Sequence, residues 1–413
     1  MLNGPFSPWP SFSQEEADAV SRVVLSNRVN YWTGTQFREF EKEFAHWTGT
    51  SHAIALSNGT LALDLALHGL RIGSNNGGSA EDEVIVTPRS FIASVSTVVN
   101  AGAVPVFADV DPDSGNLNAE TAARVITERT RGIIAVHLAG YPCDMDPIMA
   151  LAAAHDIKVI EDCAQAHGAM YKGRMVGSIG HVGAWSFCQD KIMTTGGEGG
   201  LVTCDDEAVW RRMWAFKDHG KSWEAVYERA HPPGFRWLHE SIGTNWRMLE
   251  VQGVLGRIQL GRMAQWTEAR TANARALTEA LTLFARPNGP VRLPDLNCDG
   301  YAGADQSGTV HAFYKYYFYL RPENLAAGWN RDAISDEINK RGVPCFQGSC
   351  SEIYREKAFD GTGWRPEAPL TASRDLGSVS LMLLVHPTLR QDEISKACGV
   401  LSEVLNMTRE PLA

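Results

Sequence analysis

Between about Ser51 and Cys204, stretches with helix-like composition alternate with short, strand-like apolar runs. Such alternation is typical of a parallel sheet whose crossover helices cover both faces. Ile157–Ile160 is one such run, after a helix-like stretch from Pro147 to His155, and Gly183–Phe187 is another. We therefore expect an α/β fold whose ligand-binding groups gather at the carboxyl ends of neighbouring strands.

An acidic residue follows the first of these runs. Asp162 is expected at the carboxyl end of its strand. A carboxylate that faces a pyridine nitrogen there, in a low dielectric, favours the protonated ring, which is an electron sink. A lone Asp after a strand also suits a plain helix cap, so Asp162 by itself leaves both interpretations open.

A lysine follows the second run. The loop that carries Lys191 is expected to lie beside the loop of Asp162. The tract Gly196–Gly200 gives the backbone room for close approach to a ligand, although such a tract is also typical of a flexible turn. One lysine able to form an imine and one carboxylate able to keep a pyridine ring protonated together indicate a pyridoxal phosphate site.

A third segment has the pattern of a helix start. Ser57–Thr60 directly precedes Leu61–Leu67, a run of good helix formers. Free amides at a helix N-terminus bind phosphate well, and here Gly59 allows close approach while Thr60 supplies a hydroxyl. The alternative is an ordinary N-cap. Ser186, five residues before the lysine, offers the same phosphate a further hydroxyl.

Taken together, these segments resemble the sugar aminotransferases of the DegT/DnrJ/EryC1/StrS family, within the fold-type I pyridoxal phosphate enzymes. Several ordered motifs at suitable separations carry the resemblance along most of the chain. Besides the segments above they are Gly34–Glu41, Thr87–Pro88 with Phe91, Pro105–Asp111, Val136–Asp146, Glu161–Gly168 and Gly243–Met248.

The resemblance implies a fold and a domain organisation. It implies an α/β, fold-type I aminotransferase with a mostly parallel, seven-stranded-type sheet in a large cofactor domain and a smaller C-terminal α/β domain. The expected units are an N-terminal arm and helix over residues 1–30, the pyridoxal phosphate-binding large domain over 31–260, and the small domain over 261–413.

The resemblance also implies catalytic and cofactor-binding roles. Lys191 would hold the cofactor as an imine and later move protons between the substrate carbon and C4′ of the cofactor. Asp162 would bind the pyridinium nitrogen, Gln165 would hydrogen-bond near the phenolic oxygen, and Phe91 would stack on the ring. The phosphate would be held by Gly59, Thr60 and Ser186.

The implied reaction has two substrates and a dimeric enzyme. Asn245 would reach the phosphate of the neighbouring subunit's cofactor, which implies a homodimer with shared active sites. Glutamate or glutamine would leave its nitrogen on the cofactor as pyridoxamine 5′-phosphate, and a keto sugar nucleotide would collect it. The product would be an amino sugar for a surface polysaccharide or a secondary metabolite. Relatives that dehydrate sugars carry histidine at the lysine position, so Lys191 indicates transamination.

Departures from the family pattern keep other substrates open. Val343–Cys350 replaces a His-Tyr-x-Pro-Leu-His-like stretch, and Phe346, Gln347 and Ser349 stand where histidines are common. One alternative is therefore amination of a keto-cyclitol such as scyllo-inosose. A more distant alternative is a non-catalytic cofactor-binding regulator. The retained lysine and aspartate, and the lack of an attached DNA-binding region, argue against a regulator.

Charge bears on the possible partners. The formal net charge is −10 over 413 residues, with no basic block, which argues against a nucleic-acid partner. Locally placed cations can still bind a diphosphate, and we expect one or two of those available to contact substrate. They are Arg28, Lys217, His219, Lys221, Arg236 and Arg247.

Cysteine spacing and hydropathy bear on metal binding and location. The eight cysteines show no CxxC spacing, and no second Cys or His pair accompanies Cys345 and Cys350 at zinc-site distance. We expect reduced thiols and no metal site. No charged-then-apolar signal segment opens the chain, and no apolar run nears the roughly 18 residues of a membrane helix. The expected location is the cytoplasm, with no membrane partner.

The remaining segments complete the expected layout. A helix is predicted to begin near Ser13, and a long helical pattern runs over Leu249–Leu283. An aromatic strand over Phe313–Arg321 and a helix over Arg331–Arg341 are assigned to the small domain. The Trp-rich section Trp210–Trp246 is interpreted as an insertion that covers the site, and its aromatic side chains suit the core, which we favour, subunit contacts or a pocket wall.

Overall fold

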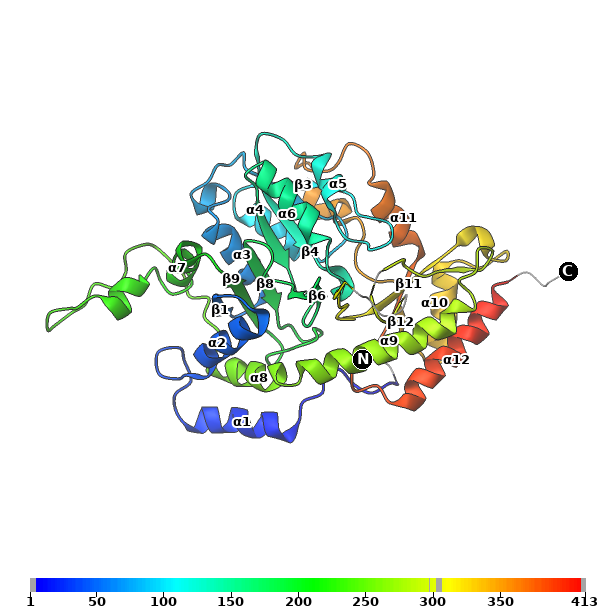
Figure 1. The fold of residues 1–413 in the computed structure, drawn as a ribbon, viewed down its shortest axis with the longest axis horizontal. Helices are drawn as coiled ribbons and strands as arrows, with labels where there is room; N and C mark the ends of the chain where they lie inside the picture. Colours follow the sequence, from blue (N-terminus) through cyan, green and yellow to red (C-terminus); the bar gives the residue numbers. More distant parts are fainter. Residues whose placement is uncertain (1–4, 297, 302–306, 410–413) are drawn as a thin grey trace.

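The computed structural model of the protein describes residues 5–296, 298–301 and 307–409. Its largest unit is a seven-stranded sheet of order β1-β9-β8-β5-β4-β2-β3 (Figure 1). In this sheet only β9 runs against its neighbours, so the prediction of a mostly parallel sheet is confirmed. The strands are β1 (His52–Leu56), β2 (Glu83–Val86), β3 (Val104–Phe107), β4 (Thr130–Val136), β5 (Lys158–Asp162), β8 (Val182–Ser186) and β9 (Gly200–Cys204).

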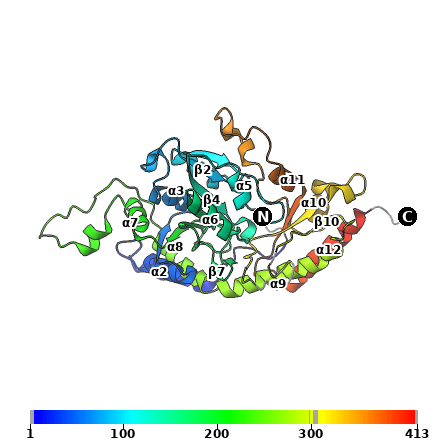
Figure 2. The ribbon, with the colours of Figure 1, turned by 45° about the horizontal axis from the view of Figure 1, so that its top comes forward.

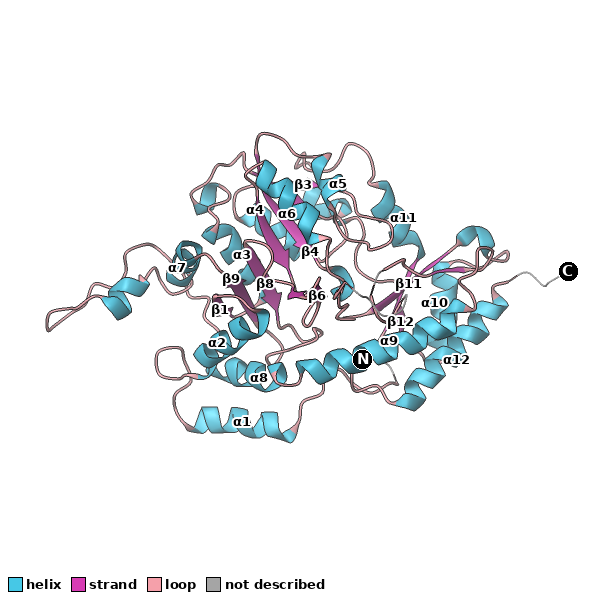
Figure 3. Cartoon of the chain, viewed as in Figure 1, coloured by secondary structure: helices cyan, strands magenta, loops and turns pink. Residues whose placement is uncertain are grey.

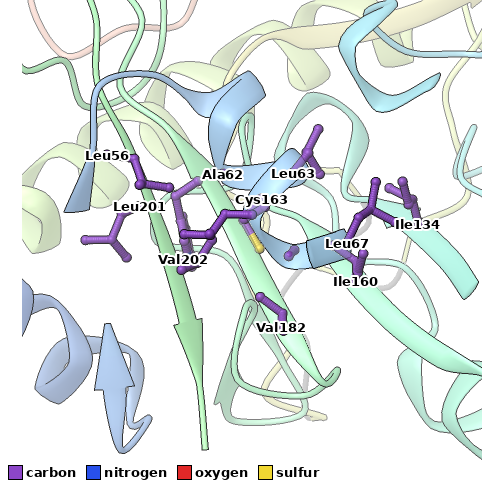
Figure 4. Close-up of a cluster of buried hydrophobic side chains, with 14 of the residues drawn as sticks. Leu56, Ala62, Leu63, Leu67, Ile134, Ile160, Cys163, Val182, Leu201 and Val202 are labelled. Carbon is purple, nitrogen blue, oxygen red and sulfur yellow. The ribbon is translucent and has the colours of Figure 1, made fainter. Parts of the chain in front are cut away.

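Helices cover both faces of this sheet (Figure 3). Successive side chains of a strand point to opposite faces, and the apolar residues divide accordingly. Ile134 and Ile160 join the cluster that contains α3, as Figure 4 shows, whereas Ile133 and Val159 join a second cluster with α6. The helices around the sheet are α2 (Gln36–Thr48), α3 (Gly59–Gly69), α4 (Ala93–Asn100), α5 (Ala119–Ala123), α6 (Met145–Ala154) and α7 (Glu207–Phe216).

A second, smaller sheet has the order β10-β11-β13-β12. Two helices, α9 and α12, lie side by side along it (Figures 1 and 2). The strands are β10 (Val291–Arg292), β11 (Tyr316–Leu320), β12 (Cys345–Phe346) and β13 (Ser380–Leu383), and the helices are α9 (Met263–Thr282), α10 (Arg331–Lys340), α11 (Thr371–Val379) and α12 (Gln391–Met407). A two-stranded ribbon pairs β6 (Met170–Tyr171) with β7 (Arg174–Met175). The predicted domain boundaries at 30/31 and 260/261 stay predictions.

Two sequence-based boundaries were wrong. The segment Leu249–Leu283 forms two helices, α8 (Glu250–Leu260) and α9. Gly261 is the C-cap of α8, a position that glycine favours, and the side chain of Arg262 binds residues outside both helices. The Arg262 guanidinium donates to Glu16 and Ser13 at the start of α1 (Gln14–Leu25), 3.0 Å away in each case. The aromatic strand begins only at Tyr316, since Phe313 adopts a left-handed φ of 47° that no strand accommodates.

The helix predicted near Ser13 is present as α1. Ser13 and Glu16 form a capping box there, as the sequence indicates. Among the described residues, no helix has both the length and the apolar character needed to cross a bilayer.

Glu161 ties the end of β5 to the loop before β8. Glu161 is fully buried. Because successive side chains of a strand point to opposite faces, it points away from α3 and toward His137. His137 Nδ1 accepts from the Cys143 amide, so its Nε2–H donates to Glu161, 3.0 Å away. Burial raises the pKa of Glu161, but His137 and backbone donors outweigh it and hold the pKa below its ordinary value. The backbone donors are the amides of Gly177, Ile179 and Gly180, at 2.6–2.8 Å.

This network also explains the one group of potential metal ligands among the described residues. His137, Glu161 and Cys163 bring ligand atoms within 4.8 Å of one another. Both carboxylate oxygens of Glu161 and Nδ1 of His137 already accept hydrogen bonds within the protein. The group is therefore a satisfied structural network that anchors the strand carrying Asp162.

We expect Glu161→Gln to lower the free energy of unfolding by about 3 kcal/mol at pH 7, because an amide nitrogen would then face buried N–H donors. The folded-state pKa of Glu161 is lowered, so its contribution is complete above the ordinary value of 4.5 and is lost as pH falls through the folded-state pKa. Urea unfolding at pH 7 and in acid measures this difference. The control is Glu120→Gln, whose side chain is 75% exposed; equal stability of the two variants at pH 7 would contradict the prediction.

Candidate active site

A cavity of about 1150 Å³ lies at the carboxyl ends of β4, β5 and β8 and reaches the C-terminal sheet. Parallel sheets bind ligands at this edge, and the volume exceeds the usual range for one small ligand. Seven of the eight predicted site residues line it, and Asn245 does not. The seven are Gly59, Thr60, Phe91, Asp162, Gln165, Ser186 and Lys191.

Asp162 ends β5 on the face opposite to Glu161. It is 5% exposed, and Ser94 of α4 donates a hydrogen bond to its Oδ2 over 2.7 Å. The Ala164 amide donates to Oδ1 over 3.1 Å. This contact resembles the helix cap that was the alternative interpretation of Asp162. Because Asp162 also lines the cavity, its carboxylate is held in place where it can meet a protonated ring nitrogen.

Lys191 lines the same cavity from the loop after β8. Its side chain is 15% exposed, and its carbonyl oxygen accepts from Trp9 Nε1 over 2.9 Å. The Nζ atom lies 3.8 Å from Asp190 Oδ1 and 5.1 Å from the centroid of the Tyr314 ring. Burial raises the pKa of Asp190, but the charge of Lys191 and the hydrogen bond from Tyr314 outweigh it, so that pKa is lowered. The reactive amine therefore has a carboxylate and an aromatic ring beside it.

The N-terminus of α3 lies against the end of β8. Asn58 is the N-cap, and its Oδ1 accepts from the Leu61 amide over 3.0 Å. A Cβ atom at Gly59 would lie 2.4 Å from Cβ of Ser186. Only glycine therefore allows the helix start and the Ser186 hydroxyl to share one wall of the cavity. Helix amides beside hydroxyls fit a phosphate group, as the sequence predicted.

We expect Gly59→Ala to lower stability by about 1–3 kcal/mol and to weaken retention of a phosphate-bearing cofactor, because the added methyl forces α3 and β8 apart. Gly399→Ala is a matched control, since its Cβ meets nothing within 4 Å in α12. That variant should be as stable as the wild type or up to about 1 kcal/mol more so. Thermal unfolding and cofactor loss on dialysis measure both effects, and equal behaviour of the two variants would refute the close approach.

Gln165 and Phe91 also have groups available to a ligand. Gln165 Oε1 accepts from the Ala139 amide over 2.7 Å, which leaves the side-chain NH₂ to donate elsewhere. Phe91 is 67% exposed although it is aromatic, so its ring can pack against a bound molecule. Both residues thus suit the roles that the resemblance implies.

The structure also places residues in the cavity that sequence reasoning missed. Trp9 comes from the N-terminal arm, and Tyr314 and Lys315 come from the segment before β11. The aromatic composition of that segment was recognisable, but nothing local indicates that it lies against the lysine loop. Of the residues that depart from the family pattern, Phe346 and Ser349 line the cavity. Gln347 lies outside it and donates to Asp332.

Within the same chain, the Trp-rich section does not cover this cavity. No residue of Trp210–Trp246 lines it. Trp214 is buried in the core, and the segment that includes Glu224–Glu228 and the loop after it projects away from the sheet, at the left of Figure 1. Phe235 and Trp237 in this extension are 75% and 76% exposed. The extension therefore exposes apolar side chains to solvent, away from the cavity.

The six cations proposed for a diphosphate also lie outside this cavity. Lys217 Nζ is buried 3.9 Å from the centroid of the Tyr31 ring. Lys221 and Arg247 both pair with Asp218, which forms a backbone bridge with Asn245. Lys221, Arg247 and Asn245 thus lie together around Asp218, outside this chain's cavity.

Comparisons with known proteins agree with this geometry. Residues 10–402 match the DegT/DnrJ/EryC1/StrS aminotransferase family. The GDP-perosamine synthase of Caulobacter vibrioides is 42% identical over 400 residues, which are 96% of this chain and 97% of that protein. The L-glutamine:2-deoxy-scyllo-inosose aminotransferase of Streptomyces kanamyceticus is 36% identical over 286 residues, 67% of this chain and 65% of that protein. A solved aminotransferase from Psychrobacter cryohalolentis superposes with a TM-score of 0.94 at 60% identity, covering 98% of this chain and 100% of that one.

Proposed function

Since the chain belongs to the DegT/DnrJ/EryC1/StrS aminotransferase family, whose members are pyridoxal phosphate-dependent, we propose that it transfers an amino group from glutamate or glutamine to a nucleotide-linked keto sugar. The product is an amino sugar for a surface polysaccharide or a secondary metabolite. One observation carries the proposal: Lys191, Asp162 and the N-terminus of α3 converge on a single cavity large enough for the cofactor and a substrate together.

The residues of this cavity suit pyridoxal phosphate. When bound, that cofactor carries the amino group and withdraws electrons from the substrate carbon. The carboxylate of Asp162, fixed by Ser94, would keep a proton on the ring nitrogen. The amides of Gly59 and Thr60 and the hydroxyl of Ser186 would hold the phosphate. Phosphate and ring nitrogen thus fix the two ends of one flat molecule.

The other cavity residues control the ring and the proton. Gln165 would donate from its free NH₂ group to the phenolic oxygen, and Phe91 would restrict the tilt of the ring. Lys191 would hold the cofactor through its Nζ, and the same amine, once free, would serve as the base that takes up and returns the substrate proton. Asp190 and Tyr314 hold this amine inside the cavity.

Homodimerisation with shared sites is part of the same proposal. Asn245 lies outside its own chain's cavity, as expected of a residue that serves a neighbouring subunit. The exposed Phe235 and Trp237 of the extension offer apolar surface for that contact. The charge of −10 and the hydropathy pattern also support a cytoplasmic enzyme with no nucleic-acid or membrane partner.

Mixed dimers test the shared site. Asn245→Ala should weaken cofactor retention, and Lys191→Ala should be inactive. A purified dimer with one protomer of each variant should regain about half of the wild-type activity, because one of its two sites then has both groups. Activity no higher than that of the variant homodimers would show that each chain completes its own site.

The keto-cyclitol is the second candidate, favoured by the similarity to the scyllo-inosose aminotransferase. The presence of Phe346 and Ser349 at the cavity is compatible with either acceptor. Family membership and the assembled site set aside the non-catalytic regulator.

Absorbance of the bound cofactor tests the reaction class. Glutamate or glutamine should bleach the band of the lysine-bound cofactor, and a keto sugar nucleotide should restore it. A panel of keto sugar nucleotides, with product mass as the readout, then identifies the acceptor. Restoration by scyllo-inosose and by no keto sugar nucleotide would replace the proposal with the cyclitol reaction.

A further inference from the structure

Lys315 is a cavity residue that none of the roles above uses. It directly precedes β11 and lines the cavity together with Lys191. Its Nζ lies 4.9 Å from the centroid of the Tyr314 ring, and Lys191 Nζ lies 5.1 Å from the same centroid. In the part of the chain that the structure describes, no hydrogen bond or salt bridge engages the Lys315 ammonium. The cavity therefore has a second amine beside the ring that Lys191 also approaches, and the described residues offer it no acceptor.

Positive charge exceeds negative charge around these amines. Arg270 of α9 is fully buried and donates only to backbone oxygens, those of Phe313 and Tyr314. Within the described residues it has no carboxylate partner, and its Nε has no acceptor. Asp190 is the carboxylate beside Lys191, and it also accepts from Tyr314. Three cations thus surround this wall of the cavity against one anion.

The pKa values of these cations agree with the excess of positive charge. Burial, reinforced by Arg270 and Lys191, lowers the pKa of Lys315 to about 8. Burial likewise lowers the pKa of Arg270 to about 9. A bound anion would relieve the repulsion between these cations, and a carboxylate or phosphate oxygen is the natural acceptor for a buried ammonium.

The position of these cations beside Lys191 distinguishes between two possible anions, the carboxylate of the amino donor and the diphosphate of the sugar nucleotide. In an α-amino acid, the carboxylate sits on the same carbon as the amine, and that amine must displace Lys191. The carboxylate of the donor therefore lies only a few bonds from the atom that replaces Lys191 Nζ, where a cation of the same wall can bind it. The diphosphate of a sugar nucleotide is separated from its keto carbon by atoms of the sugar ring, so it reaches a more distant part of the cavity.

We propose that Lys315 binds the α-carboxylate of the amino donor. The inference rests on the proposed function, since it takes an amino-acid donor and the chemistry of Lys191 as given. Arg270 acts through Lys315: it holds the backbone at Phe313 and Tyr314 and keeps the wall positive. Donor and keto substrate then use one cavity in turn but different cations.

Lys315→Met in the holoenzyme separates the two half-reactions. We expect kcat/KM for L-glutamate, followed by cofactor absorbance, to fall about 100-fold, as for loss of a charge-assisted contact. The acceptor half-reaction, started from enzyme loaded with pyridoxamine phosphate, should change less than about threefold. Lys315→Arg should recover part of the donor rate. An amine that lacks the α-carboxylate, 4-aminobutyrate, should react equally slowly with the wild type and with Lys315→Met.

Binding without turnover gives an independent readout. Calorimetry of L-glutamate with Lys191→Ala and with the Lys191→Ala, Lys315→Met double variant should show about 100-fold weaker binding to the double variant. Lys340→Met is the matched control: it makes the same change on a side chain that is 73% exposed and outside the cavity, and should leave both half-reactions unchanged.

Each outcome is decisive. An unchanged donor half-reaction in Lys315→Met, or a loss confined to the acceptor half-reaction, overturns the assignment. If Lys315→Met does not fold, the donor rate of Lys315→Arg and the affinity of the Lys191→Ala, Lys315→Arg variant for glutamate decide in the same way. A wild-type enzyme that accepts nitrogen from glutamate but passes it to no keto sugar nucleotide would refute the proposed acceptor and leave Lys315 assigned.

Discussion

Replacing Lys191 with alanine should lower the rate of amino-group transfer by at least about 10⁴-fold, because it deletes the group that we propose both holds the cofactor and moves the proton. The fold should survive, with the free energy of unfolding changed by no more than about 1 kcal/mol, because the ammonium end carries no packing role. The side chain lines the cavity and keeps its charge beside Asp190.

Steady-state kinetics and thermal unfolding of the same preparation measure the two effects together. Lys158→Ala is a suitable control, because that side chain is 41% exposed and lies outside the cavity. Full transaminase activity in Lys191→Ala would remove this residue from the chemistry. A large loss of stability would mean that the lost activity reports unfolding.

Replacing Asp162 with asparagine should lower kcat by about 10²–10³-fold, the usual range for loss of one electrostatic stabiliser in a closed site. An amide has nearly the same shape but cannot balance the charge of a protonated ring nitrogen, so the electron sink weakens while the cofactor can still bind. The hydrogen bond from Ser94 to Oδ2 can persist, because the asparagine oxygen also accepts.

The measurement is kcat for the variant under saturating cofactor, together with the absorbance maximum of the bound cofactor. Asp146→Asn provides the comparison, since that carboxylate is 48% exposed and pairs with Lys172 and Arg174 away from the cavity. A kcat within about threefold of the wild type would contradict the role of Asp162 as the counterion of the ring.

The sequence predicted the sheet and most of the cavity because those features depend on local signals. β-branched runs mark buried strands, and the residues just after them, Asp162 and the loop of Lys191, must lie at one edge of the sheet. The helix start at Gly59 is also a local signal. Ordered motifs that recur in a family then relate these separate signals to one ligand.

The features that the sequence did not predict depend on contacts between distant segments. Trp9 and Lys315 reach the cavity from segments that lie far apart in the chain, and no periodicity records that approach. The break between α8 and α9 depends on Arg262, whose partners lie about 250 residues earlier. The direction of the segment that includes Glu224–Glu228 is likewise a tertiary property, which the Trp-rich composition alone does not indicate.

Glu161 and Asp162 are neighbours at the end of β5 and face opposite sides of the sheet, so their positions depend on the register of that strand. Deleting one residue upstream of Glu161 would turn each carboxylate to the other face of β5: Glu161 would face the cavity, Asp162 would face the loop network, and Cys163 would take the place of Asp162. The number of residues between α6 and β8 therefore decides which of the two carboxylates faces the cavity.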